Sequence, residues 1–334
     1  MKSEKFFVIG SNSFTGATVV DYLLARGKEV IGTSRSAQAS RAFLPYTWPD
    51  SRPAGARFEF QQLDLNRHTD ELAASIKKFE PDYVLNFAAQ SMVAESWLHP
   101  EHWYQTNVVA NVRLHEKLRQ FPFIKKYVHV TTPEVYGSCS GNVTETAPIN
   151  PSTPYAASRA ACDLHLMTFF KNYKFPVVFT RAANVYGPGQ QLYRILPRTV
   201  FFIKTGRKLQ LHGGGRSVRS FIHGRDVSEG TLLVAQNGVP GETYHLSTDL
   251  YLSIRELVER ICARMGVNFS EVVEVVGDRP GKDAAYLLDS TKARTTLGWK
   301  AVVSLDQGIE ETIAWVAHNL EELKRQPSDY IHKP

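Results

Sequence analysis

The chain has 334 residues, of which 43% are hydrophobic and 22% are charged. This length accommodates a large nucleotide-binding domain and a smaller lobe, and the composition excludes a disordered or fibrous chain. Lysine and arginine outnumber aspartate and glutamate by 39 to 33, which gives a formal net charge of +6. Because the basic residues are scattered, we expect them to form mainly a solvated surface. The alternative is that two or three of them converge in one cleft and hold an anionic small molecule, and nucleic acid is the weaker hypothesis.

The three cysteines, Cys139, Cys162 and Cys262, lie far apart in the sequence. Their number and spacing suggest neither a disulfide framework nor a zinc site, so we expect no bound metal. The N-terminal residues enter an apolar strand directly, and no apolar stretch reaches the roughly 18 residues that a membrane span requires. We therefore expect a cytoplasmic protein that is neither exported nor bound to a membrane.

The first half of the chain alternates short apolar runs with helical patterns, as a parallel sheet flanked by helices does. The predicted strands are Lys5–Ile9, Glu29–Thr33, Phe58–Gln61, Tyr83–Phe87, Lys126–Thr131 and Val177–Thr180. Apolar periodicity predicts long helices over Trp103–Phe121 and Tyr155–Tyr173. The expected fold class is α/β, with a Rossmann-type doubly wound parallel sheet in residues 1–183.

The second half is less regular, with glycine- and proline-bearing loops between shorter elements. Ser253-Ile-Arg-Glu256 and Ser304-Leu-Asp-Gln307 are typical of capping boxes, and they predict helices over Ile254–Met265 and Leu305–Lys324. We expect residues 184–334 to form mainly a smaller, mixed α/β substrate-binding lobe, with some segments returning to the Rossmann domain.

The first predicted strand ends in the turn Gly10-Ser-Asn-Ser-Phe-Thr-Gly16, and a helix follows at once. Backbone N–H groups and the helix dipole bind a pyrophosphate at such a turn. The spacing departs from Gly-x-Gly-x-x-Gly, so a simple tight turn is the alternative. The cofactor-binding residues expected here are Gly10, Asn12, Ser13, Phe14, Thr15 and Gly16.

The second strand is followed by Ser34, Arg35 and Ser36, with no carboxylate to bind the ribose hydroxyls of NAD. Guanidinium and hydroxyl donors suit a 2′-phosphate, so we expect NADP as the cofactor, with NAD as the alternative. A surface arginine in a loop is the simpler role for Arg35.

Two further segments fall at the carboxyl ends of strands three and four, the edge where open α/β sheets bind ligands. We assign both segments to the cofactor. Their residues are Asp64, Leu65, Phe87, Ala88 and Ala89.

A polar motif, Thr131-Thr-Pro-Glu-Val-Tyr-Gly137, follows the fifth strand, and Tyr155-Ala-Ala-Ser-Arg159 begins a helix. Residues four apart share a helix face, so Arg159 is expected beside Tyr155, where it favours the phenolate. A cation about 4 Å away at an effective dielectric near 20 is worth about 4 kcal/mol, or roughly three pKa units. We therefore expect appreciable phenolate near neutral pH, although burial of the ring opposes the shift in pKa.

Together with the Gly10–Gly16 turn, these motifs resemble the extended short-chain dehydrogenase/reductase family of nucleotide-sugar enzymes, and the resemblance covers almost the whole chain. It is closest to the 4,6-dehydratases, which are hydro-lyases, because Thr132 and Glu134 stand where those enzymes keep a threonine and a proton-abstracting glutamate.

Other motifs resemble particular branches of the dehydratases. The segment Asp278-Arg-Pro-Gly-Lys-Asp283 is similar to one in dTDP-glucose 4,6-dehydratases, whereas Ala89-Gln-Ser91 and the Arg35 turn are more like those of GDP-mannose 4,6-dehydratases. Asn184-Val-Tyr-Gly-Pro188 and Arg219-Ser-Phe-Ile-His223 resemble motifs of the same group.

The resemblance implies a closed redox cycle on a nucleotide-diphosphate sugar, with Thr132, Glu134, Tyr155 and Arg159 as the catalytic residues. Tyr155 takes the proton of the 4-hydroxyl as hydride passes from C4 to the dinucleotide, and Thr132 hydrogen-bonds the same oxygen. Glu134 then removes the C5 proton, water leaves from C6, and the hydride returns to C6. The product is a 4-keto-6-deoxy sugar.

The substrate diphosphate is expected to bind amide and guanidinium groups. Arg219 is the foremost candidate, because paired guanidinium donors match two phosphate oxygens, and a surface salt bridge is the alternative role of each arginine. The expected substrate-binding residues are Gln90, Ser91, Asn184, Arg194, Arg219 and Arg279.

Three positions depart from the family pattern. Ser13 replaces the middle glycine of the turn, which leaves less room for a pyrophosphate. Pro133 replaces the aspartate that dTDP-glucose enzymes use as an acid, so Glu134 is expected to serve as both base and acid. Arg159 replaces a nearly universal lysine, which changes the expected contact to the nicotinamide ribose.

Two other functions remain open at this point. An epimerase or decarboxylase of the same family would use Tyr155 and the cofactor without eliminating water, and Glu134 argues against the epimerase more than against the decarboxylase. A non-catalytic dinucleotide sensor would explain why three departures coincide, but the intact Tyr155, Thr132 and Glu134 favour an enzyme.

The family resemblance also implies a homodimer, in which Trp103–Phe121 and Tyr155–Tyr173 build a four-helix interface. Val108, Val112 and Leu166 either lie in that interface or face the chain's own sheet.

Overall fold

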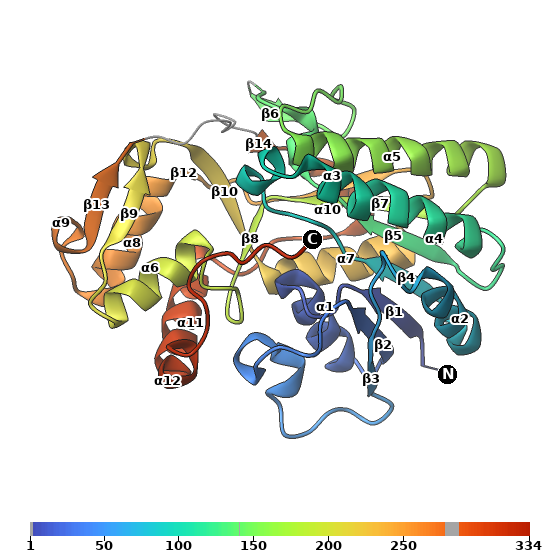
Figure 1. Ribbon diagram of the computed structural model, residues 1–334, viewed down its shortest axis with the longest axis horizontal. Helices are drawn as coiled ribbons and strands as arrows, with labels where there is room; N and C mark the ends of the chain where they lie inside the picture. The colour runs from blue at the N-terminus through green and yellow to red at the C-terminus, as the bar shows by residue number, and fades with distance from the viewer. Residues whose placement is uncertain (1–2, 140, 278–286) are drawn as a thin grey trace.

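A sheet of seven parallel strands forms the centre of the computed structural model, which describes residues 3–139, 141–277 and 287–334 (Figure 1). The strands are β1 (Lys5–Ile9), β2 (Glu29–Ser34), β3 (Arg57–Gln62), β4 (Tyr83–Asn86), β5 (Lys126–Val130), β7 (Val177–Ala182) and β11 (Thr243–Leu246). Their order is β11-β7-β5-β4-β1-β2-β3. The chain therefore winds outward in both directions from β1 and β4, and the predicted doubly wound sheet is confirmed.

Each face of this sheet is covered by helices because successive side chains of a strand point to opposite sides. Phe6 and Val8 pack with helices α1 and α7, whereas Phe7 and Ile9 pack with α2, α4 and α5. All four side chains are at most 2% exposed. The helices are α1 (Phe14–Leu24), α2 (Thr69–Phe79), α4 (Asn111–Leu118), α5 (Pro154–Tyr173) and α7 (Gly224–Asn237). Leu166 of α5 belongs to this core and so faces the chain's own sheet.

The seventh strand, β11, comes from the second half of the chain and was not predicted. It pairs in parallel with β7 from Thr243 to Leu246. Helix α7 leads to it across the same sheet face that α1 covers, so this part of the second half belongs to the large sheet. The domain boundary at residue 183 stays a prediction.

The long helix predicted over Trp103–Phe121 is interrupted. A π-helical turn, Gln105–Ala110, separates α3 (Pro100–Tyr104) from α4. Asn111 Nδ2 donates to the main-chain oxygens of Thr106 and Asn107 inside this turn. Such turns often occur at functional sites, and this one directs Asn107 toward the loop after β4.

The second lobe lies at the left of Figure 1, around β9, β13 and α8. Its strands form small sheets in the orders β12-β10-β8 and β13-β9, and a further pair, β14-β6, is formed elsewhere. These strands are β6 (Asn142–Val143), β8 (Asn184–Tyr186), β9 (Leu209–His212), β10 (Val218–His223), β12 (Tyr251–Ser253), β13 (Val273–Val276) and β14 (Leu287–Leu288). The helices are α6 (Ile195–Lys204), α8 (Ile254–Met265), α9 (Phe269–Val272), α10 (Thr291–Leu297), α11 (Leu305–His318) and α12 (Leu320–Leu323).

Of the two predicted capping boxes, the one at Ser253 is complete, because Ser253 and Glu256 exchange hydrogen bonds. At Ser304 only the hydroxyl accepts from the N–H of Gln307, whose side chain donates to Glu311 instead. The helix that begins there ends at His318 and not at Lys324, and the short α12 follows it.

A loop between β2 and β3 joins the two lobes. Trp315 Nε1 of α11 donates to the main-chain oxygen of Ala42 at 2.9 Å, and Phe43 packs edge-on against the same indole. Within the described part of the chain, every helix is too short or too polar to cross a membrane.

Candidate active site

The turn after β1 passes very close to the loop after β4. Gly10 has a φ of +88°, and a Cβ atom there would lie 2.7 Å from the nitrogen of Ala88. A Cβ on Gly16 would collide with the oxygen of Gly10. Ser13 caps α1: its hydroxyl donates to Gly10 O at 2.7 Å and accepts from Gly16 N at 3.1 Å. The serine that replaces the family's middle glycine therefore stabilises the turn itself.

Several residues assigned to the cofactor from sequence make contacts within the fold. Asn12 holds the loop after β2, because its Nδ2 donates to the main-chain oxygens of Ser36 and Ala37. Asp64 Oδ1 accepts from the N–H of Asn66 in a local turn. Among the other residues assigned to the cofactor, Phe14 and Leu65 are buried in the hydrophobic core and Thr15 is half-buried.

The segment after β2 contacts the last residues of the chain. Ser34 Oγ accepts from the N–H of Asn12 at 2.9 Å. Arg35 NH1 donates at 3.0 Å to the main-chain oxygens of Lys333 and Pro334. Ser36 Oγ accepts from Lys333 Nζ at 3.1 Å. The three side chains predicted to hold a 2′-phosphate therefore have partners within the chain, with Arg35 as donor and the two serine hydroxyls as acceptors.

The loop after β4 is fixed by the π-helical turn. Asn107 is fully buried; its Oδ1 accepts from the N–H of Gln90 at 2.8 Å, and its Nδ2 donates to Gln90 O and Ser158 Oγ. Ser158 in turn donates to the main-chain oxygen of Tyr155. The sequence analysis missed Asn107, although a polar residue within an apolar helical pattern was a signal for it. Ser91 is exposed.

The loop after β5 and the start of α5 bring Thr132, Glu134 and Tyr155 together. Thr132 begins a 3₁₀ turn (Pro133–Tyr136), in which its hydroxyl accepts from the N–H of Glu134 at 3.2 Å. Tyr155 lies in the first turn of α5, is 8% exposed, and is close enough to the Thr132 side chain for that group to lower its pKa. Glu134 and Arg194 both act electrostatically on Tyr155.

Arg159 lies behind the tyrosine and is 2% exposed. Its NH2 donates to the main-chain oxygen of Val130 and lies 3.4 Å from His129 Nε2. Within the residues that the structure describes, its Nε and NH1 have no hydrogen-bond partner. A buried guanidinium with two unused donors can hold the hydroxyls of a bound ribose.

The pKa of Tyr155 is raised. Burial of the ring is the largest cause, and the nearby Glu134 carboxylate adds to it, whereas Arg159, Thr132 and Arg194 lower the pKa. This direction runs against the expectation of appreciable phenolate near neutral pH. Burial of the ring outweighs the nearby guanidinium of Arg159.

A buried polar network lies next to the loop that follows β5. Asp163 accepts from Arg181 NH2 at 2.8 Å and from Thr131 Oγ1 at 3.0 Å, so it ties α5 to β7 and to the end of β5. His129 is held neutral, because burial and then the Arg159 charge depress its pKa well below the ordinary value. Because the His129 imidazole is neutral, it places no second positive charge beside the buried guanidinium of Arg159.

The predicted substrate residues lie on several elements. Asn184 of β8 donates to the main-chain oxygen of Ser220, which links β8 to β10. Arg219 of β10 donates from NH1 to Val218 O at 2.8 Å. Arg194 begins α6, close enough to Tyr155 to lower its pKa. Arg279, like the rest of the segment 278–283, lies outside the described residues.

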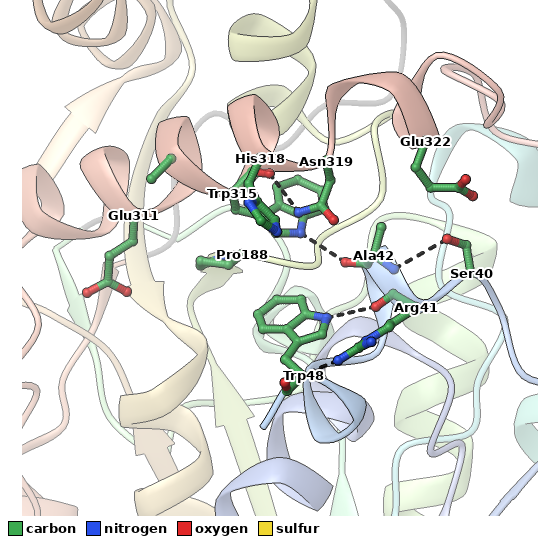
Figure 2. Close-up of a pocket in the computed structure, with 11 residues that line it drawn as sticks. Ser40, Arg41, Ala42, Trp48, Pro188, Glu311, Trp315, His318, Asn319 and Glu322 are labelled. Carbon is green, nitrogen blue, oxygen red and sulfur yellow. Dashed lines mark hydrogen bonds between the residues drawn. The ribbon is translucent and has the colours of Figure 1, made fainter. Parts of the chain in front are cut away.

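The two principal cavities lie away from this group. The larger, about 960 Å³, lies between the β2–β3 loop and α11 (Figure 2). Trp315 comes from α11 and Trp48 from the loop, with Pro188 beside both rings. The smaller, about 260 Å³, borders Asp163 and Arg181. Neither is lined by Thr132, Glu134 or Tyr155.

The carboxyl edge of the sheet fits a dinucleotide. The capped N-terminus of α1 presents backbone N–H groups, the Gly10 turn keeps side-chain atoms away from the neighbouring loop, and Arg159 keeps two buried donors. In the described residues, no group of three or more histidine, cysteine, aspartate or glutamate side chains could hold a metal ion.

Comparison with known proteins supports this geometry. Residues 7–312 match the family model described as GDP-mannose 4,6 dehydratase. A probable dTDP-glucose 4,6-dehydratase of Sinorhizobium fredii is 31% identical over 94% of this chain and 93% of the relative. The human dTDP-D-glucose 4,6-dehydratase is 34% identical over 80% of this chain and 77% of the relative.

A solved structure of the same kind matches the fold. The dTDP-glucose 4,6-dehydratase of Streptomyces venezuelae, described with NAD bound, superimposes with a TM-score of 0.87 at 33% identity. The match covers 95% of this chain and 98% of that one. The chain belongs to the GDP-mannose 4,6-dehydratase family of extended short-chain dehydrogenases/reductases.

Proposed function

We propose that this chain is an NAD-dependent nucleotide-sugar 4,6-dehydratase, which converts an NDP-hexose to an NDP-4-keto-6-deoxyhexose. The observation that carries the proposal is the grouping of Thr132, Glu134 and Tyr155 at the carboxyl edge of the sheet. A carboxylate beside the tyrosine supplies the base that elimination of water requires and that a simple oxidation or epimerisation does not.

A bound nicotinamide dinucleotide supplies the hydride acceptor and donor of the cycle. Tyr155 in its deprotonated form accepts the proton of the sugar's 4-hydroxyl, and the nearby Thr132 hydrogen-bonds the same oxygen. Once C4 is a ketone, the proton on C5 is acidic, and the carboxylate of Glu134 removes it. The bond between C6 and its hydroxyl then breaks.

Glu134 serves as both base and acid in this scheme. The next residue toward Thr132 is Pro133, which has no proton to give and is buried. The proton that Glu134 takes from C5 is therefore returned to the hydroxyl leaving C6, so water departs and the carboxylate is regenerated. The 3₁₀ turn fixes the backbone of Glu134, whose N–H donates to the hydroxyl of Thr132.

NAD is the cofactor that we propose. The Streptomyces venezuelae relative is described with NAD, and the expected preference for NADP lacks such support. Arg159 offers Nε and NH1 to the nicotinamide ribose in place of the family's lysine.

The substrate that we propose to test first is dTDP-glucose, because the named relatives are dTDP-glucose enzymes. Asn184, Arg194 and Arg219 remain the proposed diphosphate contacts within the described residues. Arg194 supports this role best, since its charge already reaches Tyr155.

The protein should release a 4-keto-6-deoxy product from one nucleotide hexose and carry NAD after purification. Incubation with dTDP-glucose, GDP-mannose and UDP-sugars, followed by mass spectrometry, checks this. Loss of water supports the dehydratase, loss of carbon dioxide indicates a decarboxylase, and an isomer of unchanged mass indicates an epimerase. Bound dinucleotide with no conversion of any sugar would favour the sensor.

Glu134→Gln should lower dehydration by roughly 10²–10⁴-fold, because the amide cannot accept the C5 proton. Dinucleotide binding should be retained, since the backbone N–H of residue 134 still donates to the Thr132 hydroxyl. Exchange of solvent deuterium into C5 should fall in parallel. Glu310→Gln, on the exposed face of α11, is the control. Undiminished product formation by Glu134→Gln would remove this residue from the mechanism.

Arg159→Ala should raise the pKa of Tyr155 further, because an opposing cation is lost. Since the deprotonated tyrosine is the base, the acidic limb of the pH–rate profile for single-turnover oxidation should move to higher pH. Dinucleotide retention should also weaken. Arg159→Lys should restore only part of the position of the acidic limb and part of the dinucleotide retention. The control is Arg260→Ala, which changes an exposed arginine of α8 and should alter neither property. If the acidic limb of the pH–rate profile does not move in Arg159→Ala, Arg159 has no role in the ionisation of Tyr155.

We propose a homodimer formed through α3, the π-helical turn and α5. These elements pack together and leave apolar side chains at the surface: Tyr104 is 41%, Val109 38% and Leu164 55% exposed. Light scattering should give twice the chain mass at micromolar concentration. Leu164→Glu should shift the protein toward monomer by placing a charge in the interface, and a monomeric parent protein would reject the proposal.

A further inference from the structure

The last residues of the chain cross from the second lobe to the large sheet. We call residues 328–334 the C-terminal strap. It begins on α6, where Arg198 NH1 donates to Ser328 O at 3.2 Å and NH2 pairs with Asp329 at 2.8 Å. In Figure 1 the red coil leaves α12 and ends in the middle of the molecule, between the two groups of elements.

Aromatic rings hold the middle of the strap against both lobes. Tyr330 packs edge-on against Tyr193, with ring centroids 5.4 Å apart. His332 stacks on Trp103 of α3, with centroids 5.2 Å apart and an interplanar angle of 7°. Its Nε2 is also hydrogen-bonded to His102 Nδ1 at 2.9 Å. Because Trp103 is fully buried, the stack anchors the strap to a rigid element.

The end of the strap lies on residues that the sequence analysis assigned to ligands. The main-chain oxygen of Lys333 accepts from Gln90 Nε2 at 2.6 Å and from Arg35 NH1 at 3.0 Å. Lys333 Nζ donates to Ser36 Oγ. Gln90 is only 2% exposed, so the surrounding packing fixes the direction of its side-chain amide.

The topology places this end of the strap over the dinucleotide turn. Gln90 follows β4 and Arg35 follows β2, and β1 lies between these two strands in the sheet. A segment that bridges Gln90 and Arg35 must therefore cross the carboxyl edge at β1, where the Gly10–Gly16 turn lies. A dinucleotide that binds this turn has to extend along the same edge.

We propose that the C-terminal strap occupies the path of the dinucleotide and competes with it, so that cofactor enters only when the strap has swung away. The proposal rests on the proposed function, in that it requires a dinucleotide at this edge. The donors of Arg35 and Gln90 cannot serve the strap's carbonyl oxygens and a bound dinucleotide at the same time. The strap thus acts as an autoinhibitory contact built into the fold.

The strength of this competition follows from the number of contacts. Apparent affinity falls by the fraction of molecules whose strap is open. The few hydrogen bonds and the one ring stack each stabilise the closed strap modestly. The loss of conformational entropy on ordering this short segment offsets much of that stabilisation. We expect the strap to be closed in most molecules but not in all, and its removal to strengthen dinucleotide binding about tenfold.

Binding kinetics on the full-length protein, stripped of bound dinucleotide, test the proposal. The probe is NADH, followed by nicotinamide fluorescence in stopped flow. A chain that ends at Asp329 should bind NADH about ten times faster than the parent, with a dissociation rate within about twofold. His332→Ala should give an intermediate increase. Ile331→Ala is the control, because this side chain is 63% exposed and lies within the same segment.

Three outcomes would contradict the strap's role. Faster dissociation in the chain ending at Asp329, with an unchanged association rate, would show that the strap covers bound dinucleotide instead of competing with it. Unchanged rates in both directions would show that the strap and dinucleotide use separate space. In both cases the parent still binds NADH and the proposed function stands. Absence of NADH binding by every variant would reject the proposed function and the strap's role together.

Hydrogen exchange provides a readout that does not depend on turnover. Addition of NAD to the full-length protein should speed amide exchange in residues 328–333, because the displaced strap loses its partners. Slower exchange on adding NAD would mean that the strap closes over the ligand, and it would overturn the competition. Urea unfolding of the chain ending at Asp329 verifies that the shortened chain is folded.

Discussion

The main chain at Gly10 passes so close to the loop after β4 that a Cβ atom at this position would lie 2.7 Å from the Ala88 nitrogen. This approach occurs where the strand order reverses, between β1 and β4. It brings together the capped N-terminus of α1 and the segment that ends in Gln90. Asn107 links Gln90 to Ser158 by hydrogen bonds. Ser158 then donates a hydrogen bond to the main-chain oxygen of Tyr155. Tyr155 is thus positioned by a chain of hydrogen bonds that starts from the loop after β4, which the Gly10–Gly16 turn approaches closely.

The sequence predicted the large sheet well where its signal was local. Lys5–Ile9 is an apolar run followed by a glycine turn, and such runs define strands buried on both faces. Strand β11 escaped prediction because its four residues, Thr243–Leu246, look like an irregular segment until β7 pairs with them. The π-helical turn was missed for a similar reason. Only the partner Gln90, 17 residues away from Asn107, explains why that polar side chain points inward.

The structure brings together the residues proposed for catalysis, whereas several residues proposed for cofactor binding make contacts within the fold. Thr132, Glu134 and Tyr155 follow strand ends and helix starts, so topology alone gathers them. Phe14 and Leu65 lie at equivalent places, yet their apolar side chains are buried in the core. The pKa of Tyr155 also departs from expectation, since spacing along a helix indicates that a cation is near but not how deeply the hydroxyl is buried.

Arg35 illustrates the limit of local inference. Its neighbours in the sequence are hydroxyls, and this pattern favours a phosphate ligand. In the folded chain the partners of its NH1 come from Lys333 and Pro334, 298 and 299 positions away. Such a contact leaves no trace in the spacing of motifs, because it joins residues near opposite ends of the chain. A basic residue at the end of β2 therefore does not by itself distinguish a cofactor phosphate from a main-chain oxygen as its partner, and the choice between them lies with the strap.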